Sequence, residues 1–167
     1  MPLGKYAFYY GVTTGFALAL ISLLSFIPVV SPVVGLVRFI AMILLTMFFV
    51  RRYRDEFNDN RLSGGEAFRL TFLMFLYIGI IAALFIGFQI KIAALGSSDE
   101  LFTILQDTYA EAGIDVSDQM ISSAIALVPY MAGIFALIGH LIIGAIVGAI
   151  YSSAFKREAP SQDIPRL

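Results

Sequence analysis

Residues 131–155 read MAGIFALIGHLIIGAIVGAIYSSAF, and this stretch decides how the chain folds. It is long enough to cross a bilayer as a helix, because about 20 apolar residues at roughly 1.5 Å per residue span the hydrocarbon core. Small residues and the chain's only histidine recur at every fourth position: Ala132, Ala136, His140, Gly144, Gly148 and Ser152. Positions four apart share one face of a helix, so this stripe predicts the close approach of a second helix.

The composition of the 167 residues is that of an integral membrane protein, with the lipid bilayer as its first partner. Hydrophobic residues make up 59% and charged residues 14%, whereas an ordinary soluble domain has about 45–50% and about 25%. The net charge of -1 shows no basic footprint, so we expect no nucleic-acid partner. The chain has no cysteine, which excludes disulfides and thiolate ligands for a metal.

Four apolar runs are long enough to cross a membrane, and we predict spans over about 6–27, 33–50, 67–92 and 125–155. The first run is longer than the apolar core of about 7–15 residues in a signal peptide, which favours a retained span over a cleaved leader. We expect residues 1–156 to form a single transmembrane domain and residues 157–167 a mobile cytoplasmic tail.

Capping signals mark helix ends outside the spans. Ser63 and Glu66 have the spacing of a capping box, which predicts a helix start before the third span. Ser98 can cap a further helix that Gly113 would stop, within an insert over about 97–123. Its apolar residues share one face: Leu101, Phe102, Leu105 and Tyr109. The predicted fold is therefore all-α, a four-helix transmembrane bundle with an external amphipathic helix between the third and fourth spans.

Small residues at fourfold spacing also occur in the first and third spans. They are Gly11 and Gly15 in the first span, and Gly79, Ala83 and Gly87 in the third. Two interpretations stay open. The stripes pack the spans of one chain together, or one of them faces a partner subunit.

The positions of Lys and Arg predict the orientation of the spans. Basic residues gather at Lys5, in the loop 51–69 and in the tail, whereas residues 92–155 contain none. Because cytoplasmic loops carry the excess of Lys and Arg, both termini are predicted to be cytoplasmic and the acidic insert to be external.

His140 is the main candidate polar site, because an ionisable group near the bilayer midplane is a functional candidate. Tyr77 and Thr14 lie at matching depth and are its expected hydrogen-bond partners. Packing through such a bond is favoured over a proton or ligand role. We expect no metal, because no second histidine or carboxylate at ligand spacing completes a site.

Arg38 and Lys91 are the basic residues expected about one turn inside the external surface. One interpretation is that both side chains extend to the lipid headgroups. The other is that they form ion pairs with the acidic insert and hold it on the bundle.

Two short motifs carry a resemblance. The sequence Arg52-Tyr53-Arg54-Asp55 precedes Gly64-Gly65-Glu66-Ala67-Phe68 at the opening of a span. With the order of spans, loop and insert, this resembles a family of small bacterial four-span membrane proteins catalogued only as a domain of unknown function. The resemblance covers about residues 5–156 and implies a bacterial inner-membrane location and a four-helix architecture. It implies no activity, cofactor or catalytic residue.

Two hypotheses about function follow. The sequence shows no nucleophile–base pair and no metal triad, so we expect neither an enzyme nor a cofactor. The favoured hypothesis is a non-enzymatic accessory, scaffold or assembly subunit, in a homo-oligomer or a larger membrane complex, that acts through helix–helix contacts. The alternative is a small oligomeric transporter or channel with His140 near the midplane.

Overall fold

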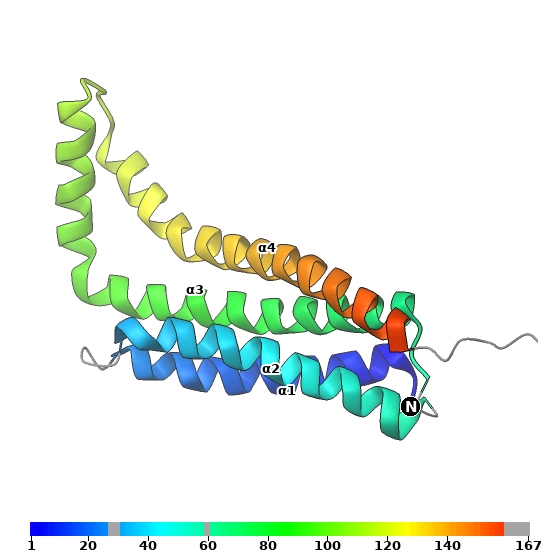
Figure 1. Cartoon of the computed structure of the whole chain (residues 1–167). Coiled ribbons are helices and arrows are strands. Elements are labelled where there is room, and N and C mark those ends of the chain that lie inside the picture. The colour runs from blue at the N-terminus through cyan, green and yellow to red at the C-terminus, as the bar shows by residue number, and fades with distance from the viewer. Residues whose placement is uncertain (27–30, 59–60, 159–167) are drawn as a thin grey trace, which may run out of the picture. The chain divides into compact units, whose positions relative to one another are not determined.

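The computed structural model describes residues 1–26, 31–58 and 61–158, which form helices joined by turns and short irregular segments. In chain order the elements are α1 (Leu3–Leu23), the 3₁₀ helix η1 (Leu24–Phe26), α2 (Ser31–Phe57), α3 (Gly64–Glu111) and α4 (Asp118–Glu158), shown in Figure 1. The prediction of an all-α fold is confirmed.

Four segments are long and apolar enough to cross a membrane: Leu3–Leu23, Val33–Phe57, Gly64–Ile92 and Asp118–Phe155. They correspond to the four predicted spans. The insert predicted as a separate helix over about 97–123 has a different form, because α3 continues to Glu111 and α4 begins at Asp118. Helical backbone continues through residues 93–98, where the sequence analysis expected a new start at Ser98.

Side-chain and glycine caps set the ends of α3. Ser63 and Glu66 form the capping box, since the Glu66 amide donates to Ser63 Oγ at 3.2 Å and the Ser63 amide donates to Glu66 Oε2 at 2.9 Å. At the other end Gly113 has φ of 70°, and its amide donates to Ala110. The Ile114 amide donates to the Tyr109 carbonyl at 2.9 Å, which completes a Schellman motif. Both predicted helix boundaries are confirmed.

The chain divides into two compact units. Unit 1 comprises Met1–Ile81 and Ile138–Leu167, and unit 2 comprises Ala82–Leu137. Unit 1 contains α1, α2, the first part of α3 and the last part of α4. Its core holds side chains without any exposed surface: Tyr6, Leu70, Met74, Phe75 and Ile78.

Aromatic residues join α1 to α2 in unit 1. Tyr6 packs on Tyr10 and Tyr53, with ring centroids 4.3 Å and 4.8 Å apart. The Tyr6 hydroxyl donates to the Phe49 carbonyl at 2.9 Å. From α4, the Tyr151 hydroxyl donates to the Ile43 carbonyl at 3.1 Å. Tyrosine hydroxyls therefore tie the backbone of α2 to α1 and to α4, while their rings fill apolar space.

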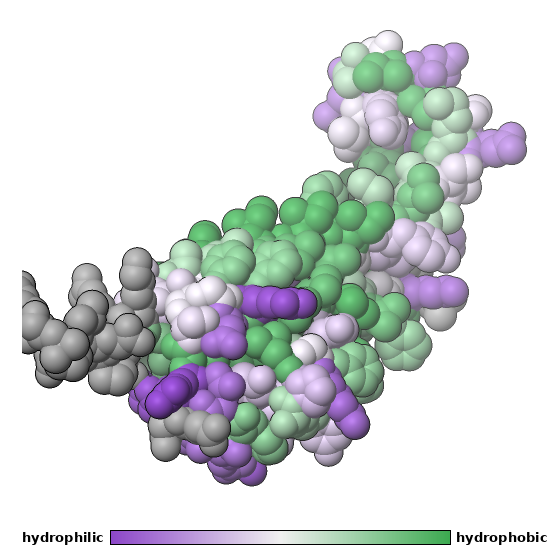
Figure 2. All heavy atoms as spheres, turned by 90° about the vertical axis from the view of Figure 1, so that its right-hand side faces the viewer, coloured by the Kyte–Doolittle hydropathy of each residue, from purple (hydrophilic) through white to green (hydrophobic). Residues whose placement is uncertain are grey.

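One end of unit 1 is hydrophilic. The last turns of α2 carry the ion pairs Arg52–Glu56 at 2.9 Å and Arg54–Asp55 at 2.7 Å. Figure 2 shows hydrophilic side chains gathered at this end, beside the apolar sides of the helices. Such a change from polar to apolar surface is what a membrane boundary requires.

Candidate functional site

The small residues of α4 in unit 1 lie against α3. A Cβ atom added at Gly144 would lie 2.5 Å from Cβ of Phe75, and one added at Gly148 would lie 3.1 Å from Cδ2 of Phe68. Carbon atoms in contact are normally about 3.5–4.0 Å apart, so Gly144 has no room for a side chain, and one at Gly148 would require the Phe68 ring to shift by a few tenths of an ångström. Ser152 continues the stripe, because a Cβ added at Gly64 would lie 2.8 Å from its carbonyl oxygen.

The glycines of α1 also lie against α3. A Cβ added at Gly11 would lie 2.9 Å from Cβ of Tyr77, and one at Gly15 would lie 2.9 Å from Cβ of Ile81. Residue numbers rise together in these contacts, so α1 and α3 run in the same direction. Gly144 meets Phe75 and Gly148 meets Phe68, so the residue numbers on α3 fall as those on α4 rise. Helix α4 is therefore antiparallel to α3. Gly79 of α3 is buried as well.

In unit 2, the second part of α3 meets the first part of α4. A Cβ added at Gly87 would lie 3.1 Å from the Pro129 carbonyl oxygen, and one at Gly133 would lie 3.0 Å from the Ala83 carbonyl oxygen. Sequence reasoning did not single out Gly133. It lies one position after Ala132, which is half-buried, as is Ala136. The sequence feature that could have identified Gly133 as a packing position is its location four residues after Pro129, on the same face of the helix.

The polar residues predicted around His140 come from three helices, with His140 on α4, Tyr77 on α3 and Thr14 on α1. His140 is half-buried on α4. The Tyr77 ring makes an edge contact with Phe8, with centroids 5.1 Å apart. Thr14 is 1% exposed, and its hydroxyl has no hydrogen-bond partner among the residues that the structure describes. The predicted bond from Thr14 to His140 is therefore not formed in this structure.

The two inward basic residues differ in exposure. Arg38 is half-buried on α2, whereas Lys91 is exposed near the end of the apolar part of α3. Lys91 forms no ion pair with any acidic residue of unit 2 that the structure describes. Across the described ranges, no group of three His, Asp or Glu residues could hold a metal ion.

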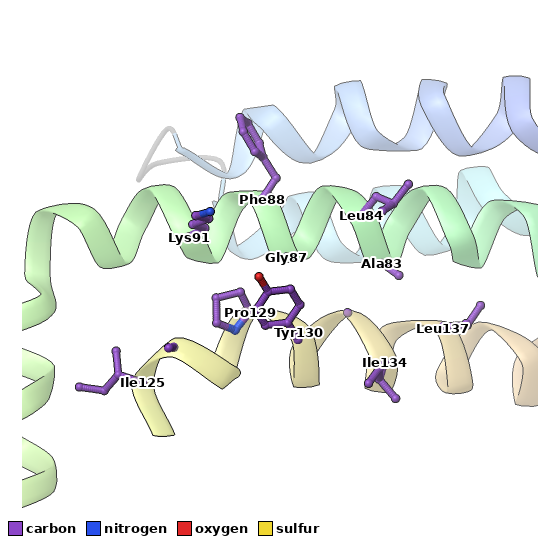
Figure 3. A pocket seen from close by; sticks show the side chains of 12 residues that line it. Ala83, Leu84, Gly87, Phe88, Lys91, Ile125, Pro129, Tyr130, Ile134 and Leu137 are labelled. Atoms are coloured by element: carbon purple, nitrogen blue, oxygen red, sulfur yellow. The ribbon is translucent and has the colours of Figure 1, made fainter. Parts of the chain in front are cut away.

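A cleft of about 730 Å³ lies between α3 and α4 within unit 2. From α3 it is lined by Ala83, Leu84, Gly87, Phe88 and Lys91. From α4 it is lined by Ile125, Ala126, Pro129, Tyr130, Gly133, Ile134 and Leu137 (Figure 3). Its walls are apolar except for the Lys91 ammonium and the Tyr130 hydroxyl. Its volume lies within the range of about 300–1,000 Å³ that is typical of small-molecule sites.

Comparison with known proteins identifies a family but no individual relative. A family model described as Protein of unknown function (DUF4199) matches residues 5–157. No match was found among curated proteins or among solved structures.

Proposed function

The chain belongs to the DUF4199 family of proteins of unknown function, and we propose that it is a non-enzymatic accessory, scaffold or assembly subunit of a membrane complex. Its four apolar helices are compatible with a multi-pass membrane protein. In the proposal this subunit works through helix–helix contacts, in a homo-oligomer or with other membrane proteins.

The observation that carries the proposal is the division of α4 into two faces in unit 1. Gly144 and Gly148 form the inner face against α3. Isoleucines two positions before and after each of these glycines form the outer face, and Ile138 continues their row. The row is Ile138, Ile142, Ile146 and Ile150. Their exposed fractions are 46%, 57%, 57% and 60%, so the chain itself leaves this row uncovered. Two residues turn a helix by about 200°, which is why the two rows lie on opposite sides.

The chemistry of this outer face suits a protein partner. A β-branched residue in a helix keeps mainly one χ1 rotamer, so it loses little conformational entropy when a neighbour packs on it. Isoleucines four residues apart form a continuous ridge, and such ridges fit the grooves of another helix. In the most apolar window of α4 only 22% of the residues are buried within the chain, which leaves surface for such a partner.

We also propose the location and orientation. The bias of Lys and Arg supports cytoplasmic termini, and the family resemblance supports the bacterial inner membrane. A reporter fused after residue 167 is expected to be active in the cytoplasm, and one inserted at Gly113 outside it. The reverse result would refute this orientation.

Photo-crosslinking in native membranes tests the role of the outer face. A photoreactive amino acid replaces Ile146, and a matched control replaces Leu20, which is 66% exposed on α1. We expect discrete protein adducts from position 146 and lipid adducts from position 20. Lipid adducts alone from both positions would refute the proposal.

Native electrophoresis in mild detergent gives an independent measurement. The double variant Ile142→Ala and Ile146→Ala is expected to reduce the mass of the complex, whereas Leu20→Ala leaves it unchanged. A wild-type protein that is monomeric and without partners would contradict the proposal. Solute flux in proteoliposomes that His140→Ala abolishes would support the transporter alternative instead.

A further inference from the structure

The cleft of unit 2 lies within the apolar segments of both of its helices. Its α3 residues fall inside the segment Gly64–Ile92, and its α4 residues inside Asp118–Phe155. In a membrane, a cleft at this position opens to lipid. Any occupant must therefore present apolar surface to most of its walls.

The cleft lies beside two close backbone contacts between its helices. The helices approach closely where Gly87 meets Pro129 and where Gly133 meets Ala83. Large side chains cannot fill the space at these contacts, and Figure 3 shows Phe88 on the side of α3 away from α4. Phe88 is 61% exposed, so it borders the cleft without closing it.

The cation of the cleft lies at one end, whereas the Tyr130 hydroxyl lies beside Gly87 in the middle (Figure 3). The contacts 83–133 and 87–129 define an antiparallel register, and one further step of four residues places Lys91 level with Ile125. Lys91 is one residue from the end of the apolar segment of α3, where headgroups are expected. Residue 129 is a proline, so the Ile125 carbonyl does not receive the usual hydrogen bond from the amide four residues later. Ile125 and Lys91 both line the cleft, so this end combines a cation with a residue whose carbonyl lacks its usual helical donor.

We propose that this cleft binds an anionic phospholipid, with one acyl chain along the apolar walls and the headgroup phosphate at Lys91. The charge of Lys91 selects the negative headgroup, because the described part of unit 2 gives this ammonium no acidic partner. A lysine near the end of a membrane helix reaches the headgroup level, where its ammonium attracts an anionic phosphate. The Ile125 carbonyl can accept a hydrogen bond from a hydroxyl of the headgroup, so phosphatidylglycerol is expected to bind more tightly than phosphatidylcholine, which has no such hydroxyl.

Photolabelling of the purified full-length protein in nanodiscs tests the proposal. The probes are phosphatidylglycerol and phosphatidylcholine, each with a photoreactive acyl chain, and the labelled residues are mapped by mass spectrometry. The wild-type protein is expected to carry phosphatidylglycerol label on the cleft residues of α3 and α4. Label spread evenly over the outer surfaces of all four helices would overturn the proposal, and this measurement needs no variant.

Two variants separate charge from space. Lys91→Gln is expected to reduce cleft labelling by phosphatidylglycerol about five-fold, the effect of one lysine near an anionic headgroup, with phosphatidylcholine labelling unchanged. Its control is Lys5→Gln, an exposed lysine outside unit 2. Ala126→Phe fills the cleft and is expected to abolish cleft labelling by both probes. Its control is Ala149→Phe, an exposed alanine of α4 outside the cleft.

Each outcome is decisive. If Lys91→Gln leaves phosphatidylglycerol labelling unchanged, the site does not select anionic lipid and the proposal is refuted. If Ala126→Phe leaves the labelling unchanged, the lipid does not occupy the cleft, with the same consequence. Circular dichroism of both variants checks that they retain the helix content of the wild type.

Discussion

Replacement of Gly144 by alanine tests the packing of α4 on α3 directly. The added methyl group would lie 2.5 Å from Cβ of Phe75 and 2.9 Å from its Cγ. Contact between carbons requires about 3.5 Å or more, so the two helices must separate locally by roughly 1 Å. The atoms that must yield belong to the base of the Phe75 side chain, which moves only with its backbone. Overpacking of this kind costs about 1–3 kcal/mol.

Gly139→Ala is the matched control on the same helix. A Cβ atom there meets nothing within 4 Å in the described structure. Alanine is favoured over glycine within a helix by about 1 kcal/mol, and this preference acts on both variants. The difference between them therefore isolates the steric cost, and we expect Gly144→Ala to be the less stable variant by about 1–3 kcal/mol.

Reversible unfolding in mixed micelles, with a denaturing detergent as titrant and helicity as the signal, measures this difference. Stabilities of the two variants within about 0.5 kcal/mol of each other would refute the close approach of α4 to Phe75. A Gly139→Ala variant that loses stability would also contradict the reasoning, because it would place an unrecognised neighbour at the open position.

Three further changes test other contacts by the same unfolding measurement. Thr14→Val is expected to raise the free energy of unfolding by about 1 kcal/mol, because it removes a buried hydroxyl without a described partner. Thr46→Val is its control. The Thr46 hydroxyl donates to the Met42 carbonyl at 2.8 Å, so its removal should bring no gain in stability. Tyr151→Phe removes the bond to α2 and is expected to cost about 1 kcal/mol; an unchanged value would show that this bond contributes nothing. Ser63→Ala breaks the capping box with Glu66 and is expected to cost about 1 kcal/mol, and no loss would contradict the cap.

The sequence predicts the helices of this chain well because each depends on local chemistry. Length and apolar content identify the four spans. The capping box at Ser63 and the left-handed glycine at Gly113 were predicted for the same reason, since both satisfy backbone groups within a few residues. The prediction of a new helix near Ser98 was wrong because it took the polar residues there as a helix end. Polar residues allow a helix to continue as readily as to end, and α3 continues to Glu111.

Register between helices could not be predicted in the same way. Gly139 and Gly144 are both glycines of one apolar helix, yet only Gly144 meets a neighbour among the described residues. The difference depends on the position of Phe75 along α3, and this position cannot be read from the spacing of residues within α4. The cleft of unit 2 depends in the same way on the pairing of Gly87 with Pro129, two residues far apart in the chain.

The parallel contact of α1 with α3 has a consequence for the biogenesis of the protein. Helices α1 and α2 leave the ribosome first and can enter the bilayer as a hairpin. In a bilayer, acyl chains would occupy the hollow that Gly11 and Gly15 present until α3 follows. Because α3 follows α1 and α2 in the chain, the groove of Gly11 and Gly15 is synthesised before the helix that fills it.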